Sequence, residues 1–180
     1  MKRLAILLIA LLLVSFSVSM IFGSDDKVKF SADGKKMEFP DKDGIPDADI
    51  SDIVFDLKNI LPEVQFMKGK IYRGWFSSPL YKSARWVNYI FLTKCDTEAI
   101  EFFLSMAGTR GKQGSHYTLT CPPRLTSDFS CTLKDRVGTS KITSTYRFTI
   151  KNGKPAIDSS SGNSAEYEEM GVLPGNVLHK

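Results

Sequence analysis

Residues 84–94 read "ARWVNYIFLTK", and this segment decides the fold class. Between Trp86 and Leu92, apolar side chains occupy both faces of an extended chain. A strand with two apolar faces belongs at the centre of a sheet, where both faces are covered. Residues 64–76 also have the pattern of a strand. The sequence therefore predicts two successive strands, of which the second is central.

Two helices are expected around these strands. Residues 48–62, "ADISDIVFDLKNILP", place their apolar residues along one helical stripe, and Asp47 or Asp49 can cap the first turn. Residues 97–108, "TEAIEFFLSMAG", carry a second stripe. Its members are Ala99, Phe102, Phe103 and Met106. This second helix is expected to pack across one face of the sheet.

Further strands are expected on both sides of this centre. Residues 27–39 predict a hairpin with an Asp-Gly turn, and the C-terminal half predicts a meander in which "KNGKP" forms an Asn-Gly turn. Residues 161–180 show little periodicity and are expected to form a flexible tail. The predicted fold is therefore α+β, with an antiparallel sheet of about five to seven strands, a meander-like C-terminal half and two helices. It forms a single domain over residues 25–160.

The first residues have the composition of a signal peptide. A short basic region precedes an apolar run over residues 4–14, after which small and polar residues return. Ser17 and Ser19 fit the small-x-small rule for cleavage, which places the cut before Met20. Residues 1–19 are therefore predicted to be a removable leader.

An uncleaved anchor is the alternative, because the apolar stretch continues to Phe22. In both cases the body of the chain is exported, so the protein is expected to be periplasmic or secreted. Loss of Lys2 and Arg3 lowers the formal charge from +4 to +2. A nearly neutral body gives no reason to expect nucleic acid, and membrane contact is expected only through an uncleaved N-terminal segment.

Three cysteines in an exported chain suggest one disulfide and one free thiol. Cys121 and Cys131 fall on the same face of two neighbouring predicted strands, on either side of a turn. That arrangement brings them to bridging distance, so they are the predicted pair. Cys95 precedes the second predicted helix without a base near it in the sequence, and it is expected to be a buried structural cysteine.

Aspartates are concentrated in residues 40–52, "PDKDGIPDADISD". The part "DKDGIPD" is similar to part of the calcium loops of thrombospondin type 3 repeats, without a second repeat. This resemblance implies calcium ligands at Asp41, Asp43 and Asp47. The EF-hand spacing lacks its first ligand and its final Glu, because apolar residues occupy both positions. A helix cap is therefore favoured, and a calcium-dependent binding module over residues 41–52 is an alternative function.

Motifs for catalysis are weak. The loop "GTRGKQGSH", residues 108–116, departs from the Walker pattern, because Gln113 follows the Gly-Lys pair and a helix precedes the loop. His116 is the only histidine of the predicted body, which excludes a site built on several histidines. A small secreted hydrolase that uses His116 or an acid pair is nevertheless kept as an alternative function. No cofactor is expected.

Cations and aromatic residues are interleaved over residues 68–86. Such side chains suit stacking on sugars or anchoring a protein interface, although Tyr72 and Trp86 are equally compatible with a core. With two cations of the 108–116 loop, the predicted partner-binding residues are Tyr72, Arg73, Trp75, Phe76, Tyr81, Arg110 and Lys112. The predicted function is an exported, non-enzymatic binding protein, such as an inhibitor, an immunity-type protein or an envelope accessory subunit. Its expected partner is a protein or a glycan of the cell envelope.

Overall fold

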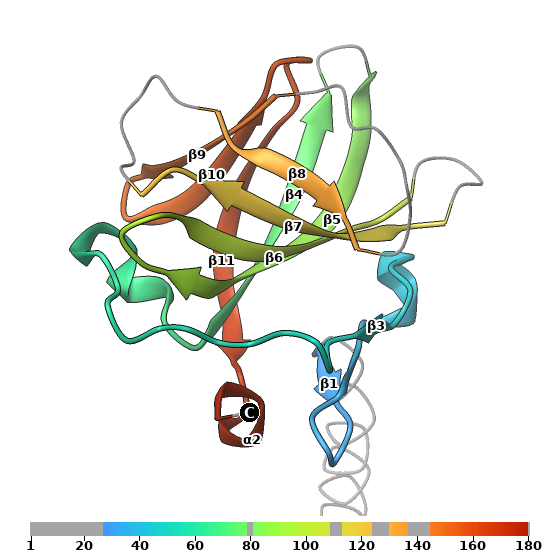
Figure 1. Ribbon diagram of the computed structural model, residues 1–180. Helices are drawn as coiled ribbons and strands as arrows, with labels where there is room; N and C mark the ends of the chain where they lie inside the picture. Colours follow the sequence, from blue (N-terminus) through green and yellow to red (C-terminus); the bar gives the residue numbers. More distant parts are fainter. Residues whose placement is uncertain (1–26, 79–80, 109–112, 124–129, 137–144, 180) are drawn as a thin grey trace, which may run out of the picture.

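The structure is a computed structural model, shown in Figure 1. It describes residues 27–78, 81–108, 113–123, 130–136 and 145–179, without the side chains of residues 78 and 81–84. The predicted signal peptide lies outside these residues. Within the described ranges, no helix is both long enough and apolar enough to span a membrane.

An eight-stranded antiparallel sheet dominates the molecule, and its spatial order is β8-β7-β6-β5-β4-β11-β10-β9. The strands are β4 (Lys70–Ser78), β5 (Tyr81–Cys95), β6 (Ile100–Met106), β7 (Ser115–Cys121), β8 (Thr132–Asp135), β9 (Tyr146–Lys151), β10 (Lys154–Ser159) and β11 (Ser164–Val172). Neighbours in space are neighbours in sequence, except that β11 pairs with β4. The chain therefore runs up and down around the sheet.

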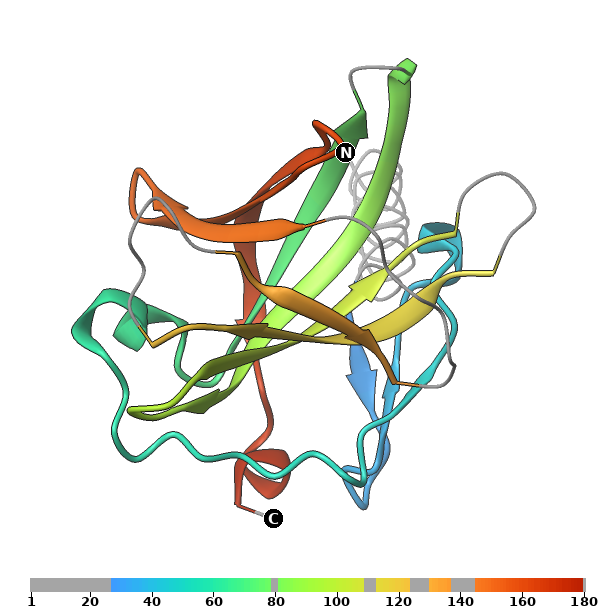
Figure 2. The same ribbon diagram turned by 45° about the horizontal axis from the view of Figure 1, so that its top comes forward.

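The two edges of this sheet nearly meet. A single antiparallel bridge joins Cys131 to Tyr146, next to the edge strands β8 and β9, and the Cys131 N–H donates to the Tyr146 carbonyl oxygen over 2.6 Å. Figures 1 and 2 show the strands curving around a common interior. The sheet is thus nearly closed and barrel-like, with an inner and an outer face.

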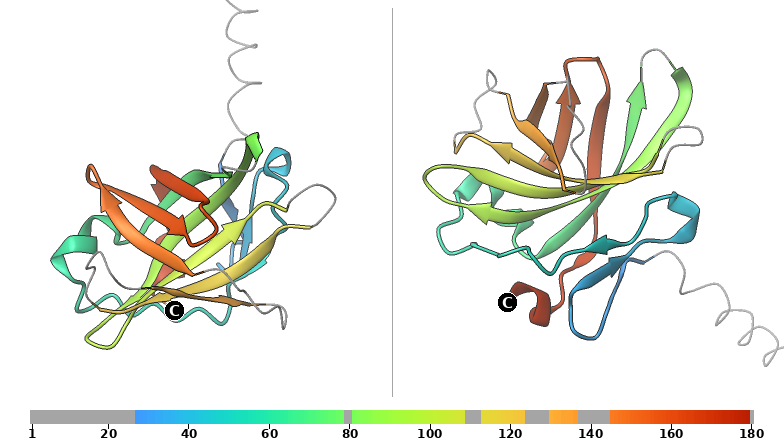
Figure 3. Two further views of the ribbon diagram at one scale, coloured as in Figure 1. Left: turned by 90° about the horizontal axis from the view of Figure 1, so that it is seen from above. Right: turned by 45° about the vertical axis from the view of Figure 1, so that its right-hand side comes forward.

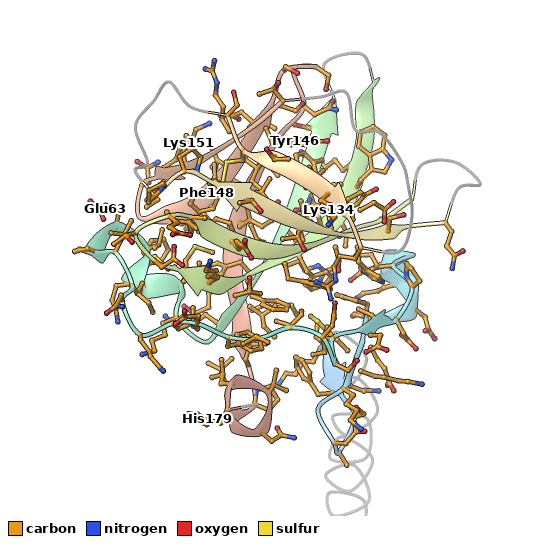
Figure 4. All side chains as sticks on the ribbon, in the orientation of Figure 1. Glu63, Lys134, Tyr146, Phe148, Lys151 and His179 are labelled. Carbon is orange, nitrogen blue, oxygen red and sulfur yellow. A yellow bond between two sulfur atoms is a disulfide. The ribbon has the colours of Figure 1, made fainter. Side chains whose placement is uncertain are left out.

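The inner face encloses one hydrophobic core. Phe148 of β9, labelled in Figure 4, stacks on Phe102 of β6 with ring centroids 4.3 Å apart. Tyr167 of β11 is fully buried in the same core. Side chains therefore fill the interior, as expected for eight strands, and each buried apolar side chain contributes roughly 1.5–3 kcal/mol.

A second core lies on the outer face. A small sheet of β1 (Lys29–Phe30), β2 (Lys36–Glu38) and β3 (Ala48–Asp49) covers it, together with helix α2 (Gly175–Leu178). Figure 3 shows these elements beside the large sheet. Under them, Phe91 and Phe103 stack with ring centroids 4.7 Å apart. The central strands are therefore covered on both faces, as the pattern of residues 84–94 predicts.

The predicted α+β architecture with two helices is wrong. Residues 97–108 form strand β6 instead of a helix. Ile100, Phe102 and Leu104 point into the interior core, while Phe103 points into the outer core. The strand is hydrogen-bonded to β5 on one side and β7 on the other. Two cores need apolar side chains on alternate faces, and this period of two overrides the helical stripe.

The other predicted helix, over residues 48–62, is also absent. Ile50 and Ile53 pack on the outer core, whereas Leu57 packs on the interior core, and Val54, one of the apolar residues of the predicted stripe, is 73% exposed. Asp56 forms an isolated bridge to Lys94, so this segment is hydrogen-bonded to the end of β5. Two short 3-10 turns, η1 (Asp41–Asp43) and η2 (Pro62–Met67), precede and follow it.

Residues 161–180, predicted to be a flexible tail, contain β11 and α2. β11 pairs with β4 on one side and β10 on the other, so it completes the sheet. The predicted Asn-Gly turn joins β9 to β10, where Asn152 and Gly153 have φ values of 53° and 73°. The predicted hairpin near the N-terminus pairs β1 with β2.

The predicted disulfide is confirmed. Cys121 and Cys131 are bonded, with Cα atoms 4.3 Å apart. Cys95 is buried, and its sulfur accepts a hydrogen bond from the Leu61 N–H over 3.3 Å. Burial raises the pKa of the Cys95 thiol. This cysteine therefore has the environment of a structural residue rather than a nucleophile.

Candidate functional site

Strands β4 and β5 divide the predicted partner-binding residues between two faces. Side chains alternate along a strand, so Tyr72 and Phe76 point into the interior core, while Arg73 and Trp75 point outward. Burial, followed by the charge of Glu169, raises the pKa of Tyr72 to about 12. Tyr72 and Phe76 are thus core residues, and the contiguous stretch does not form one surface.

Among the described side chains of β4 and β5, Trp75 is the exposed aromatic residue. Its side chain is 42% exposed, and the Arg73 guanidinium lies over its ring with Cζ 5.0 Å from the centroid. Arg85 of the neighbouring strand is exposed and lies on the same face, two residues before Val87, the cross-strand partner of Trp75. These residues and Lys42 border a hollow of about 410 Å³, which we call the outer groove.

The charge of the outer groove is positive. Lys42, Arg73 and Arg85 line it, together with one acidic residue, Asp43. The Asp43 carboxylate is already paired: it accepts hydrogen bonds from Arg73 Nη2 over 2.7 Å and from the Tyr89 hydroxyl over 2.5 Å. The groove therefore presents a net positive charge beside an exposed indole ring, an arrangement that suits an acidic partner.

Three of the predicted partner-binding side chains lie outside the described part of the structure. They are those of Tyr81, Arg110 and Lys112. Arg73 and Trp75 line the outer groove as a pair. Arg85 and Lys42 join them, although they were not among the predicted site residues. The interleaved cations of residues 68–86 already pointed to Arg85, whereas Lys42 comes close only through the fold.

The three aspartates named as calcium ligands are not gathered into one group in the described part of the structure. Asp43 is buried against Arg73, while Asp41 and Asp47 are exposed. Among the described residues, no three His, Cys, Asp or Glu side chains are grouped so that they could hold a metal ion. The helix-cap interpretation is wrong, because residues 48–61 do not form a helix. Asp43 and Asp52 tie the segment to the sheet, Asp43 by its ion pair with Arg73 and Asp52 by its ion pair with Arg136.

His116 helps to hold the same segment in place. Its Nε2 donates to the Asp47 carbonyl oxygen over 3.1 Å, so Nδ1 is the acceptor for the Ser105 hydroxyl, 2.9 Å away. The ring is stacked between Phe39 and Phe103 and is only 5% exposed. Burial lowers the pKa of His116. The predicted hydrolase role requires a histidine open to substrate, and here the Ser105–His116 pair is covered.

A second hollow opens at one end of the large sheet. Its volume is about 440 Å³. Residues at or beside the ends of β4 and β6 line it, together with residues at or beside the starts of β5, β7, β9 and β11. Phe76 and Trp86, a cross-strand pair on the inner face, form one wall. We call this hollow the mouth pocket. The outer groove and the mouth pocket share Trp86, which lies between them.

Comparisons with known proteins do not inform these two sites. No protein-family model, curated protein or solved structure matches the chain. The chemistry of the outer groove and of the mouth pocket is therefore the basis for assigning a function.

Proposed function

We propose that this protein is an exported, non-enzymatic binding protein whose outer groove engages an acidic segment of a protein partner. The observation that carries the proposal is Trp75, which remains 42% exposed with Arg73 stacked on it. Tryptophan and arginine are the residues most enriched among those that dominate interface energies. A large aromatic ring held rigidly by a cation loses little conformational freedom when a partner covers it.

The charges of the groove support an acidic partner. Arg85 is exposed, and Asp43, the carboxylate among the residues lining the groove, is neutralised by Arg73. Positive charge at the rim of an interface raises the association rate with an acidic partner and makes it sensitive to salt. The expected complex therefore forms faster at low ionic strength.

Export is supported by the leader-like residues 1–19 and by the Cys121–Cys131 disulfide, since disulfides persist in oxidising compartments. An exported protein that acts by covering a partner's surface is suited to the role of an inhibitor, an immunity-type protein or an accessory subunit of an envelope assembly.

The test is affinity capture from the envelope and extracellular fractions of the producing cell. Wild type, Trp75→Ala and Arg85→Ala are compared with Val172→Ala, which removes another exposed apolar side chain, 69% exposed, from a different place. The proposal predicts a protein that wild type and Val172→Ala retain and that both groove variants lose. If all four proteins retain the same partners, the groove is not the binding surface.

A further inference from the structure

The mouth pocket is independent of the outer groove in its chemistry. Its walls contain four aromatic rings, from Phe76, Trp86, Tyr117 and Tyr146, and two amides, from Gln113 and Asn163. Asp, Glu, Lys, Arg and His are missing from the described residues that line it. Figure 4 labels Tyr146, at the start of β9. The pocket is thus aromatic and polar without being charged.

A buried hydroxyl without a partner lies in the interior core, on Tyr167, which is not itself one of the residues that line the pocket. Tyr167 is completely buried in the interior, and its hydroxyl has no hydrogen-bond partner among the described residues. Burial raises the pKa of Tyr167 well above its ordinary value, and the nearby Tyr146 adds to the effect. Burial also raises the pKa of Tyr146, with a further contribution from Tyr117. Tyr117 and Tyr146 pack against the interior core that contains Tyr167, and both of them line the pocket.

An unpaired buried hydroxyl is costly in a folded protein, so its presence needs a physical reason. Small-molecule sites combine apolar walls with a few polar groups that fix the ligand's orientation. The volume of about 440 Å³ lies within the range of such sites. An eight-stranded, nearly closed sheet is also wide enough at its mouth to hold one small ligand.

We propose that the mouth pocket binds a neutral sugar ring. The C–H face of a pyranose stacks on an aromatic side chain such as Trp86, and its hydroxyl groups donate to and accept from the amides of Gln113 and Asn163. A purely apolar ligand would offer no hydrogen bond to the Gln113 amide or to the Asn163 side chain, whose Nδ2 already donates to Ser161 Oγ over 3.2 Å, and covering unpaired polar atoms is unfavourable. A charged ligand would lose its hydration without meeting an opposite charge among the described lining residues.

Intrinsic fluorescence gives a direct test, because the chain contains two tryptophans, Trp75 and Trp86. In the Trp75→Phe variant, the remaining indole is Trp86, which lines the mouth pocket and the adjoining outer groove, so calorimetry locates the site of any change in emission. This variant is titrated with maltose, cellobiose and N,N′-diacetylchitobiose up to about 10 mM, a range that detects weak binding. The neutral apolar probe N-phenyl-1-naphthylamine serves as the comparison. At least one disaccharide is expected to change the emission in a saturable manner.

Calorimetry then locates the site on the wild-type background. Asn163→Ala removes one amide and is expected to weaken binding about fivefold, the effect of one lost hydrogen bond. Trp86→Ala removes the stacking surface and is expected to weaken it roughly tenfold. Val172→Ala, on β11 away from the pocket lining, is expected to bind like wild type. Circular dichroism shows whether each variant is folded. If a variant is unfolded, Gln113→Ala is used in its place, because Gln113 is exposed.

Three results would overturn the proposal. The first is that none of the three disaccharides binds. The second is that the apolar probe binds in the pocket and the sugars do not displace it. The third is that a sugar binds with equal strength to wild type, Asn163→Ala and Gln113→Ala, which would place it elsewhere. Binding of a protein partner through Trp75 is measured in a separate experiment. The proposal for the outer groove and the proposal for the mouth pocket can therefore be refuted independently.

Discussion

Asp43 of the N-terminal segment forms a buried ion pair with Arg73 of β4, with Oδ1 and Nη2 2.7 Å apart. The Tyr89 hydroxyl donates to the other carboxylate oxygen. The same guanidinium stacks on Trp75. One carboxylate thus fixes the N-terminal segment to the sheet and also holds the cation that supports the exposed indole of the outer groove.

Removing one partner of this pair is predicted to be strongly destabilising. Asp43→Ala leaves Arg73 with a partly buried and unpaired charge, which lowers the free energy of unfolding by about 3 kcal/mol. Asp41→Ala, at an exposed position in the same 3-10 turn, is the matched control and is expected to change it by less than about 0.5 kcal/mol. Urea denaturation measures both. Equal stability of the two variants would show that the pair does not dock the segment.

Gly74 is predicted to be required for the packing of Tyr167. A Cβ atom at Gly74 would lie 2.7 Å from the Glu166 carbonyl oxygen and 2.8 Å from Tyr167 Cδ1. Gly74→Ala should therefore lower the free energy of unfolding by about 1–3 kcal/mol. At Gly171, in the adjacent strand, a Cβ atom would meet nothing within 4 Å. Thermal unfolding is expected to show a lower melting temperature for Gly74→Ala only.

The fold could be predicted in part. Residues 84–94 identify a central strand because a strand with apolar side chains on both faces is stable only where both faces are covered. The Asn152–Gly153 turn is predictable because both residues tolerate positive φ. The disulfide follows from matching positions on neighbouring strands.

The helices were mispredicted for a physical reason. In residues 97–108, Phe102 and Phe103 fit a helical stripe as well as two opposite faces of a strand, so the sequence pattern alone does not separate the two structures. The outer face of β6 is buried only because the N-terminal segment covers it. His116, for example, stacks on Phe103 of β6 and on Phe39 of that segment. Long-range packing of this kind leaves no local periodicity in the sequence.

The candidate site was predictable to the extent that it follows strand alternation. Trp75 is exposed, whereas Phe76, its neighbour and also a predicted partner-binding residue, is in the interior core. The two roles alternate along one strand, and the composition of residues 68–86 contains no indication of which residues face outward. Lys42 reaches the outer groove from the N-terminal segment, which the sequence places far from β4.

Stability is predicted to depend on pH through His116. Burial lowers its pKa below the ordinary value of 6.5, so the unfolded chain binds the proton more readily than the folded protein. Its contribution to stability is therefore complete above pH 6.5 and is lost as the pH falls from there through the lowered pKa. Nearby Arg136 also lowers the pKa of His116, whereas Asp135 and Asp47 oppose the shift.

Urea denaturation between pH 7.5 and 5.5 tests this dependence, with a slope of up to about 1.4 kcal/mol for each pH unit. His116→Gln should flatten the slope. His179→Gln, which changes the exposed histidine near the C-terminus, should leave it as in wild type. A slope that survives in His116→Gln would assign the pH dependence to other groups.

The Cys121–Cys131 bond is predicted to stabilise the fold by lowering the conformational entropy of the unfolded chain. It closes a loop with a sequence separation of 10, and replacing both cysteines by alanine should lower the free energy of unfolding by about 2–3 kcal/mol. Cys95 should react with Ellman's reagent only after unfolding, because it is buried in the native state. Rapid reaction of Cys95 in the folded protein would contradict its placement in the interior core.

The central claim is that the exposed Trp75 side chain anchors a protein partner. Calorimetric titration of the captured and purified partner with wild type, Trp75→Ala and Val172→Ala tests it most directly. Loss of a dominant interface residue is expected to cost at least about 2 kcal/mol, or roughly 30-fold in affinity, for Trp75→Ala, with Val172→Ala unchanged. Equal affinity of Trp75→Ala and wild type for that partner would contradict the account.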